Sequence, residues 1–342
     1  MTSKGNRQGR LNPMRVLGIA IVIAVGLALF PQIMGTYQTM ILAYGLLFAM
    51  AGLGFNLLLG YTGLLSFGHS AFYGLGAYAV AFAARDLGIT SMELLLLCGL
   101  GATVALSVVF GLVCVGLTRI FFAIMCLALS QVLWSLSYKF FWVTGGTDGI
   151  RVKWPSLLGL TEYSGGGAFQ RFVNDYYYYV LVIFCVVVVG MWIIAHSPFG
   201  KALQAIRDNE TRAEFLGVNI RKYRLISYVV SGSVTGLAGT LWVPLAGLIT
   251  PDTLWWPFSG KLVFLTLLGG FRNFTGPIVG GVLYNYLEVY AVASTEYWQL
   301  VLGGTLVVII VVLPTGIVGG LSRLMSKLRA KGEPQREPVT DG

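Results

Sequence analysis

Apolar runs of about 20 residues recur along most of the chain, and short polar segments separate them. A helix of that length spans the hydrocarbon core of a bilayer, which is about 30 Å thick. The eighth run is short and the third begins in a glycine-rich stretch, so both are expected to be broken or re-entrant helices. The pattern predicts about ten spans, at residues 16–35, 40–59, 66–84, 94–118, 120–143, 177–195, 223–247, 259–271, 277–294 and 297–314.

The runs lack the alternation of apolar and polar residues, over segments of about 10 residues, that a transmembrane β-barrel needs. We therefore predict an all-α polytopic membrane protein with a single transmembrane domain at residues 16–322. A basic N-terminus at residues 1–15 precedes this domain, and a charged tail at residues 323–342 follows it. The first run is long for a signal peptide and no small-residue cleavage site follows it, so an uncleaved span is expected.

Basic residues are distributed unevenly between the polar segments. The chain has 23 Lys and Arg residues and a net charge of +9. With ten spans and a cytoplasmic N-terminus, 17 of these 23 residues fall on the cytoplasmic side and six at or beyond the outer side. Because cytoplasmic segments carry the excess of Lys and Arg, both termini are predicted to be cytoplasmic. The short basic clusters between apolar runs set topology, so no nucleic-acid partner is expected.

The polar segment at residues 197–224 is the most highly charged part of the middle of the chain. It holds nine of the 37 charged residues (23 basic and 14 acidic) of a chain that is 56% hydrophobic. Its first two residues, Ser and Pro, are typical of a helix start. Phe199, Leu203 and Ile206 recur at helical spacing and form one apolar stripe.

A second short helix is predicted directly after the first. Asp208 and Asn209 favour a turn, the residues from Thr211 to Glu214 form a capping box, and Gly217 suits the end of the helix. Residues 197–222 are therefore expected to form a helix-turn-helix on the cytoplasmic face. Its apolar stripe needs a surface to pack on. The membrane domain is expected to supply part of that surface and a soluble partner the rest; the alternative is a plain connector.

Small residues mark the expected contacts between spans. GxxxG spacing lets helix backbones approach closely in lipid, and it occurs at Gly232 with Gly236 and at Gly276 with Gly280. The outer segment at residues 144–175 is rich in glycine, and either packs over the bundle or forms a docking surface.

Groups for catalysis or metal binding are not evident. The chain has no G-x-x-x-x-G-K-[ST] phosphate-binding loop and no nucleophile–base or metal-ligand cluster. Its four cysteines lie in apolar runs without CxxC spacing and are interpreted as small buried hydrophobes. The protein is therefore not expected to be an enzyme, and no cofactor or metal is expected to bind it directly.

Several stretches together resemble one family of transporters. SPFGKALQAIRDNETRAEFLGVN is similar to the cytoplasmic coupling loop of the permease subunits of branched-chain amino-acid ATP-binding-cassette (ABC) importers. GYTGLLSFGHSAFYGLGAYAVA, TGGTDGI and LTLLGGFRNFTGPIVGGVLY resemble other motifs of that family, as does the segment YWQLVLGGTLVVIIVVLPTGIVGGL. The resemblance runs from about residue 40 to 320 and fits the M-type of the two paired permeases. One departure is LTRIFFAIMCLALSQV, where only Arg119 remains of the usual Arg-Gly pair.

The resemblance implies a permease domain that moves substrate by alternating access in a bacterial inner membrane. It implies four kinds of partner besides lipid: an H-type permease, two cytoplasmic ABC ATPases that use the ATP, and an extracytoplasmic substrate-binding protein. The helix-turn-helix would couple the ATPases to the bundle. The residues expected to do so are Phe199, Leu203 and Ile206 as apolar contacts, Arg207, Asp208 and Glu210 around the turn, and Gly217 at the helix end.

Polar residues at membrane depth are costly and often line a transport path. The candidate lining residues are Asn56, Gly63, Ser66, His69 and Gln131. For His69, a hydrogen bond to a neighbouring helix is an equal alternative, and the same caution covers Asn56 and Gln131.

Other functions remain open at this stage. A related ABC permease for urea, short amides or aromatic acids has a similar sequence. A secondary transporter would need paired acidic residues or broken helices at the membrane midplane, and Glu288, near an outer end, is the clear intramembrane acid.

Overall fold

The computed structural model describes residues 24–117, 119–159, 163 and 165–321. The predicted basic N-terminus and charged tail lie outside the described residues. The long helices are α2 (Thr36–Asn56), α3 (His69–Asp86), α4 (Met92–Cys114), α5 (Arg119–Lys139), α7 (Ala168–His196), α10 (Ile220–Ala246), α11 (Trp256–Gly269), α12 (Gly276–Ser294) and α13 (Trp298–Val312). Residues 24–33, the described part of the first predicted span, are helical as well.

Shorter elements connect these helices. Between α5 and α7 lie α6 (Phe141–Thr144), the 3-10 turn η2 (Gly146–Asp148) and strand β1 (Ile150–Arg151). Between α10 and α11 lie strand β2 (Leu248–Ile249) and the 3-10 turn η3 (Pro251–Leu254). The connection between α7 and α10 contains α8 (Pro198–Asp208) and α9 (Glu210–Phe215).

The predicted fold class, an all-α polytopic membrane protein, is confirmed. Six helical segments of the described part are long and apolar enough to cross a membrane. The short eighth run is α11, with 14 residues. The third run, predicted at 66–84, corresponds to α3, which begins only at His69. The residues before it, 63–68, are not helical and follow a π-helical stretch, η1 (Leu57–Thr62), at the end of α2. That each of the ten runs crosses the bilayer stays a prediction.

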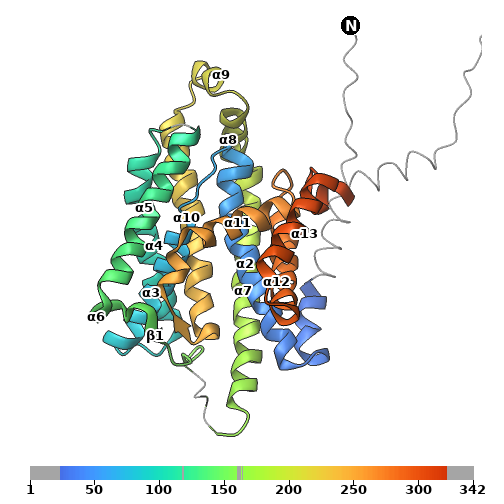
Figure 1. The fold of residues 1–342 in the computed structure, drawn as a ribbon. Coiled ribbons are helices and arrows are strands. Elements are labelled where there is room, and N and C mark those ends of the chain that lie inside the picture. The colour runs from blue at the N-terminus through green and yellow to red at the C-terminus, as the bar shows by residue number, and fades with distance from the viewer. Residues whose placement is uncertain (1–23, 118, 160–162, 164, 322–342) are drawn as a thin grey trace, which may run out of the picture.

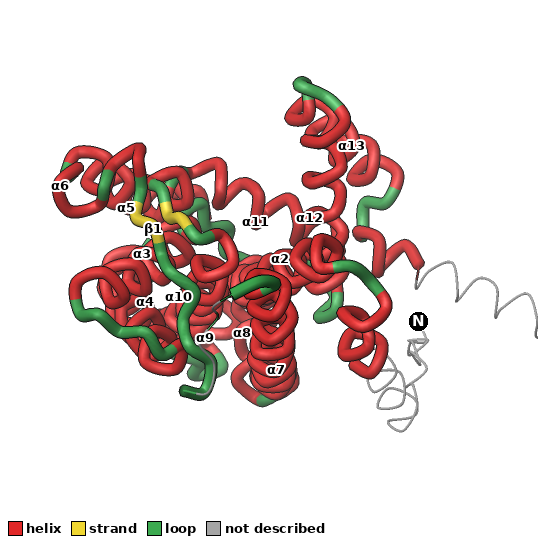
Figure 2. Tube along the Cα trace, turned by 90° about the horizontal axis from the view of Figure 1, so that it is seen from below, coloured by secondary structure: helices red, strands yellow, loops and turns green. Residues whose placement is uncertain are grey.

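Helix α2 lies in the interior of the bundle. It packs against α7, α10, α11 and α12, while α3 and α4 pack on the other side of α10 (Figures 1 and 2). Most of α2 is buried, in contrast to α4, α5, α7 and α13, which leave long apolar faces exposed. A helix that is apolar all round suits the core, whereas an exposed apolar face suits lipid or a membrane-embedded partner.

Glycines allow the core helices to approach so closely. A Cβ at Gly236 would collide with Thr103 of α4, and one at Gly232 would lie 2.9 Å from the Cβ of Ser107 on the same helix. In the second GxxxG pair, a Cβ at Gly280 would collide with the carbonyl oxygen of Leu265 on α11, and one at Gly276 with a backbone carbonyl of the α11–α12 turn. All four glycines chosen from the sequence thus lie at close helix contacts.

The two ends of the bundle differ. Helices α8 and α9 project from one end, and β1 lies at the other (Figure 1). There β1 pairs antiparallel with β2, with Ile150 opposite Ile249, and Ser156 bridges to Ser91. The described part of segment 144–175 therefore packs over the bundle, which was one of its two predicted roles.

Replacing Gly280 with Ala is expected to destabilise the protein because the new Cβ has no room against α11. Overpacking of this kind costs about 1–3 kcal/mol, so the midpoint of thermal unfolding of the detergent-purified protein should fall by several degrees. Gly101→Ala on α4 is the matched control, since nothing lies within 4 Å of the added Cβ. Equal midpoints for the two variants would contradict the packing argument.

Candidate functional site

Helices α8 and α9 form a compact element at one end of the bundle. The backbone N–H of Gly200 donates to the hydroxyl of Ser197 at 3.3 Å, and Pro198 occupies the first helical position. The predicted start of the first helix is therefore confirmed.

The second helix begins two residues earlier than a capping box from Thr211 to Glu214 would place it. The side-chain oxygen of Asn209 accepts a hydrogen bond from the N–H of Arg212 at 2.9 Å, and α9 starts at Glu210. Asn209, with an extended backbone at φ −161°, is thus the cap, and the capping box from Thr211 to Glu214 is wrong. Gly217 ends the helix with φ +84°, a conformation that favours glycine.

The apolar stripe of α8 faces the chain's own bundle. Leu203 and Ile206 are 0% and 1% exposed, and Leu203 packs with Leu57 of η1 and Met191 of α7. Phe199 is partly buried and stacks on Tyr223 of α10, with ring centroids 5.4 Å apart. The expectation that this stripe contacts a soluble partner is therefore corrected, because the membrane domain already covers it.

Charged side chains fix the element to two core segments. The Arg207 guanidinium donates to the carbonyl oxygen of Gly60 in η1, and its aliphatic stem leaves no room for a Cβ at Gly63. Glu210 pairs with Arg224 of α10, whose side chain is only 4% exposed. Without this carboxylate, the buried guanidinium of Arg224 would carry an uncompensated charge. An ion pair therefore attaches α9 to the bundle, whereas apolar contacts attach α8.

The outer side of the element carries apolar residues that the sequence analysis missed. Phe215 and Leu216, at the end of α9, are 86% and 77% exposed. Two large neighbouring side chains in water at the tip of a charged segment are typical of an interaction site. The pair could have been recognised in the sequence, because Phe215 and Leu216 directly precede Gly217, which ends the helix, and do not belong to the apolar stripe of α8.

A polar recess lies beside the base of α8. It has a volume of about 390 Å³ and is lined by Gly60, Tyr61, Gln204, Arg207, Asp208 and Arg272. Arg207 therefore faces both the backbone of η1 and this recess, whereas Asp208 is largely exposed.

His69 is held between two neighbouring segments by hydrogen bonds. Its Nδ1 lies 3.0 Å from the hydroxyl of Ser66, and its Nε2 lies 2.8 Å from the hydroxyl of Ser231 on α10. Ser231 in turn donates to the carbonyl oxygen of Gly54 on α2, at 2.6 Å. All three side chains are fully buried. This is the arrangement that the sequence left as the alternative to a path-lining histidine.

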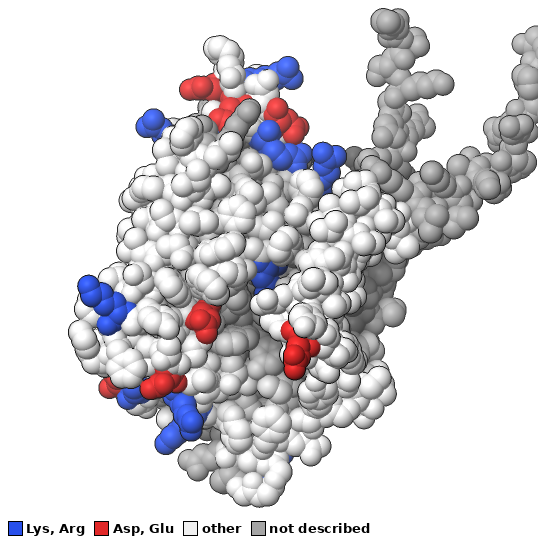
Figure 3. Space-filling model, in the orientation of Figure 1, with Lys and Arg blue, Asp and Glu red and all other residues white. Residues whose placement is uncertain are grey.

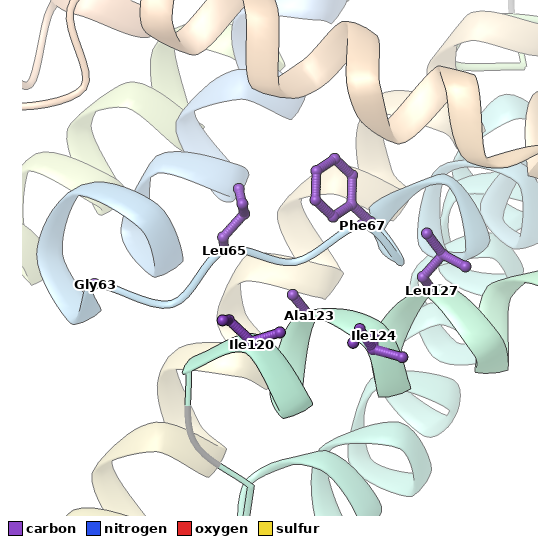
Figure 4. Close-up of a pocket in the computed structure, with 7 residues that line it drawn as sticks. All are labelled: Gly63, Leu65, Phe67, Ile120, Ala123, Ile124 and Leu127. Atoms are coloured by element: carbon purple, nitrogen blue, oxygen red, sulfur yellow. The ribbon is translucent and has the colours of Figure 1, made fainter.

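The other candidate path residues do not gather at one site. Asn56 is buried in α2, and Gln131 on α5 has a buried amide nitrogen without a partner among the described residues. Gly63 lines an apolar cavity of about 490 Å³ between the 63–68 stretch and α5 (Figure 4). The other lining residues are Leu65, Phe67, Ile120, Ala123, Ile124 and Leu127.

An ion pair between α11 and α12 joins two further charged residues that could have a role in function. Lys261 of α11 pairs with Glu288 of α12. The ammonium of Lys261 lies 4.2 Å from the ring centroid of Phe48, 5.5 Å from that of Tyr284 and 5.9 Å from that of Phe258. The sequence analysis singled out the acid but not its partner, although a lysine within the eighth apolar run was a visible signal.

Among the described residues, no group of three or more His, Cys, Asp or Glu side chains could hold a metal ion. The arrangement offers instead a helical element attached at one end, partly through the pair of Glu210 and Arg224, and an ion pair between α11 and α12.

Replacing Leu203 with Asp is expected to destabilise the purified protein, because it buries an unpaired charge between α8 and the bundle. The cost should be at least about 2 kcal/mol, measured as a lower midpoint of thermal unfolding. Phe215→Asp is the matched control, because its exposed side chain should leave the midpoint unchanged. A stable Leu203→Asp protein would show that α8 does not depend on this contact.

Comparison with known proteins adds a family to this geometry. Residues 37–311 match the family described as branched-chain amino acid transport system, permease component. The high-affinity branched-chain amino acid transport system permease protein LivM of Salmonella typhimurium is 28% identical over 332 residues, which cover 92% of this chain and 77% of the relative.

A second kind of relative carries the same description. LivH of Salmonella typhimurium is 24% identical over 80% of this chain and 92% of its own length. BraD of Pseudomonas aeruginosa is also 24% identical, over 84% of this chain and 97% of the relative. No solved structure matches the chain significantly.

Proposed function

The chain belongs to the family of permease components of branched-chain amino acid transport systems, and we propose that it is the M-type subunit of an ABC importer for leucine, isoleucine and valine. The observation that carries this proposal is the family match across residues 37–311, which includes the α8–α9 element and the ion pair of α11 and α12. The similarity to LivM over 92% of the chain supports the M-type.

We propose that the subunit works in an assembly. The relatives include both LivM and LivH, each described as a permease protein of such a system, which supports a second, H-type permease as partner. The exposed apolar faces of α4, α5, α7 and α13 offer room for lipid and for that partner. Two cytoplasmic ATPases would use the ATP, and a substrate-binding protein would deliver the amino acid at the outer face.

The α8–α9 element has the attachments that a coupling device needs. A displacement of α8 would act on η1 through Arg207 and Leu203, and a displacement of α9 would act on α10 through the pair of Glu210 and Arg224. Packed elements shift as units because close-packed interiors resist continuous deformation. We propose that ATPase closure moves the element, and that η1 and α10 pass the motion to the core. The π-helical turn η1 is the kind of irregularity at which helices often flex.

The uneven distribution of basic residues supports a cytoplasmic location for α8, α9 and both termini, in a bacterial inner membrane. Glu288 is paired with Lys261 rather than free to carry a proton alone, which favours an ATP-driven permease over a proton-coupled secondary transporter.

Deleting the gene in its host should abolish high-affinity uptake of radiolabelled leucine, and expressing the intact chain should restore it. The reason is that the bundle forms half of the only membrane path of such an importer. Unchanged leucine uptake combined with loss of urea, amide or aromatic-acid uptake would assign the permease to a related importer instead.

Replacing both Phe215 and Leu216 with Ser should reduce co-purification of the ATPase subunit with the permease, because the exposed apolar pair is free to be covered by it. A loss of about 2 kcal/mol is expected for two such contacts, which lowers the affinity about 30-fold. The permease itself should keep its thermal stability, since both side chains are largely exposed. Full retention of the ATPase would exclude this tip as the contact.

A further inference from the structure

The ion pair of Lys261 and Glu288 is unusual for its surroundings. On the face that Figure 3 shows, charged side chains gather around the α8–α9 end, a largely uncharged band follows, and separate charged patches are scattered from about mid-height downwards. A charged side chain at membrane depth is costly, and such groups commonly mark a substrate path. Two apolar side chains of similar size would join α11 to α12 at least as well. Helix packing alone therefore does not explain the pair.

Aromatic rings surround the ammonium of Lys261. Phe48 comes from α2, Phe258 from α11 and Tyr284 from α12, so three core helices contribute to one cage. The faces of such rings attract cations. Tyr73 of α3 extends the cage, since its ring lies 4.4 Å from that of Phe258 and 6.3 Å from that of Phe48.

The cage also contains an unused polar group. The hydroxyl of Tyr73 is fully buried and has no hydrogen-bond partner among the described residues. Because a buried hydroxyl without a partner costs free energy, it is available to a ligand that enters beside the ion pair.

The pair is buried but not sealed. The side chains of Lys261 and Glu288 remain 17% and 21% exposed. Lys261 lies on the narrow stripe of α11 that the bundle leaves uncovered, together with the exposed side chains of Trp256 and Phe264. α11 lies obliquely across the front of the molecule in Figure 1, between the α3–α5 side and the α12–α13 side. Part of each charged side chain therefore remains accessible from outside the bundle.

We propose that the cage of Lys261, Glu288, Phe48, Phe258, Tyr284 and Tyr73 is a transient site for the zwitterionic head group of an amino acid. The substrate carboxylate would bind the ammonium of Lys261, and the substrate ammonium would bind the carboxylate of Glu288 and the ring faces. The aliphatic side chain would lie on the aromatic rings. This inference rests on the proposed function and names how the path recognises its substrate.

Exchange of partners explains why both charges are kept. Without substrate, Lys261 and Glu288 neutralise each other; with substrate, each finds the opposite charge on the zwitterion, and the site stays neutral throughout. Both charges are paired with and without substrate. Because binding only exchanges one pair of charges for another, the site gains little free energy from the substrate and binds it weakly. Weak binding suits a translocation path, since a solute has to leave the site as readily as it enters.

The double variant Lys261→Met/Glu288→Met tests the site against a purely structural role. It removes both charges while keeping side-chain volume, so α11 and α12 should stay packed. In proteoliposomes that contain the whole importer, the rate of leucine transport should fall about tenfold or more. Such a fall corresponds to a tenfold change in the binding constant of leucine at the site. ATP hydrolysis stimulated by the loaded binding protein should stay close to the wild-type rate. Normal leucine transport by this variant would overturn the inference.

Two further variants keep the test decisive. Tyr73→Phe removes only the unpartnered hydroxyl, cannot disturb a hydrogen bond, and should lower leucine transport without lowering the amount of assembled importer. The charge swap Lys261→Glu/Glu288→Lys restores an ion pair between the helices but places a carboxylate against the ring faces, so transport should stay low. Wild-type transport by the charge-swap variant would mean that the pair is only a structural tie, and wild-type transport by Tyr73→Phe would contradict the proposed role of the hydroxyl.

The controls separate this inference from the proposed function. Arg85→Met/Asp86→Met makes the same change in an exposed ion pair at the end of α3 and should transport leucine normally. If the wild-type importer carries no leucine at all, the proposed function fails. If the wild type carries leucine and the double Met variant does so equally well, only the site fails.

Discussion

Polar groups inside the bundle have to find partners within the protein, because lipid and apolar side chains offer none. His69, Ser231 and the carbonyl of Gly54 satisfy one another across three segments. Buried threonines such as Thr240 and Thr266 donate to carbonyls one turn earlier in their own helices. The bonds between segments, unlike these intrahelical ones, also fix one helix in rotation and register against its neighbour, so satisfying His69 and Ser231 helps to define how the helices meet.

Hydrogen bonds between helices also require that the helix backbones approach closely. Gly236 and Gly280 leave no space for a Cβ, and hydrogen bonds such as that of Ser231 to Gly54 require helices that lie this near. Interiors packed in this way are stiff. A stiff core would let a small element at one end influence the whole bundle, which is what the proposed coupling through Arg207 and Glu210 requires.

The sequence reveals periodicity and composition but not which surface a face meets. Spacing identified the apolar stripe of Leu203 and Ile206, yet the stripe packs on the chain's own bundle, on the preceding helix α7 and on η1, which lies far away in sequence. His69 was recognisable as a polar group in an apolar run, but its partner on α10 was not. The helical runs and the short α11 were predictable because length and hydropathy determine them locally. The pairing of Lys261 with Glu288 depends on how α11 and α12 dock, which no local pattern contains.

Charge inside the bundle occurs in two places with opposite consequences. Arg224 is only 4% exposed and pairs with Glu210, which is 38% exposed, so this pair ties α9 to the core through a basic group that solutes cannot reach. In the other pair both Lys261 and Glu288 keep some exposure, and they lie among rings that attract cations. A pair whose basic partner is inaccessible can hold two elements together, whereas a pair with two reachable partners could exchange them with a solute that carries both charges. The exposure of the basic partner, 4% for Arg224 against 17% for Lys261, therefore supports a structural role for the first pair and the proposed binding role for the second.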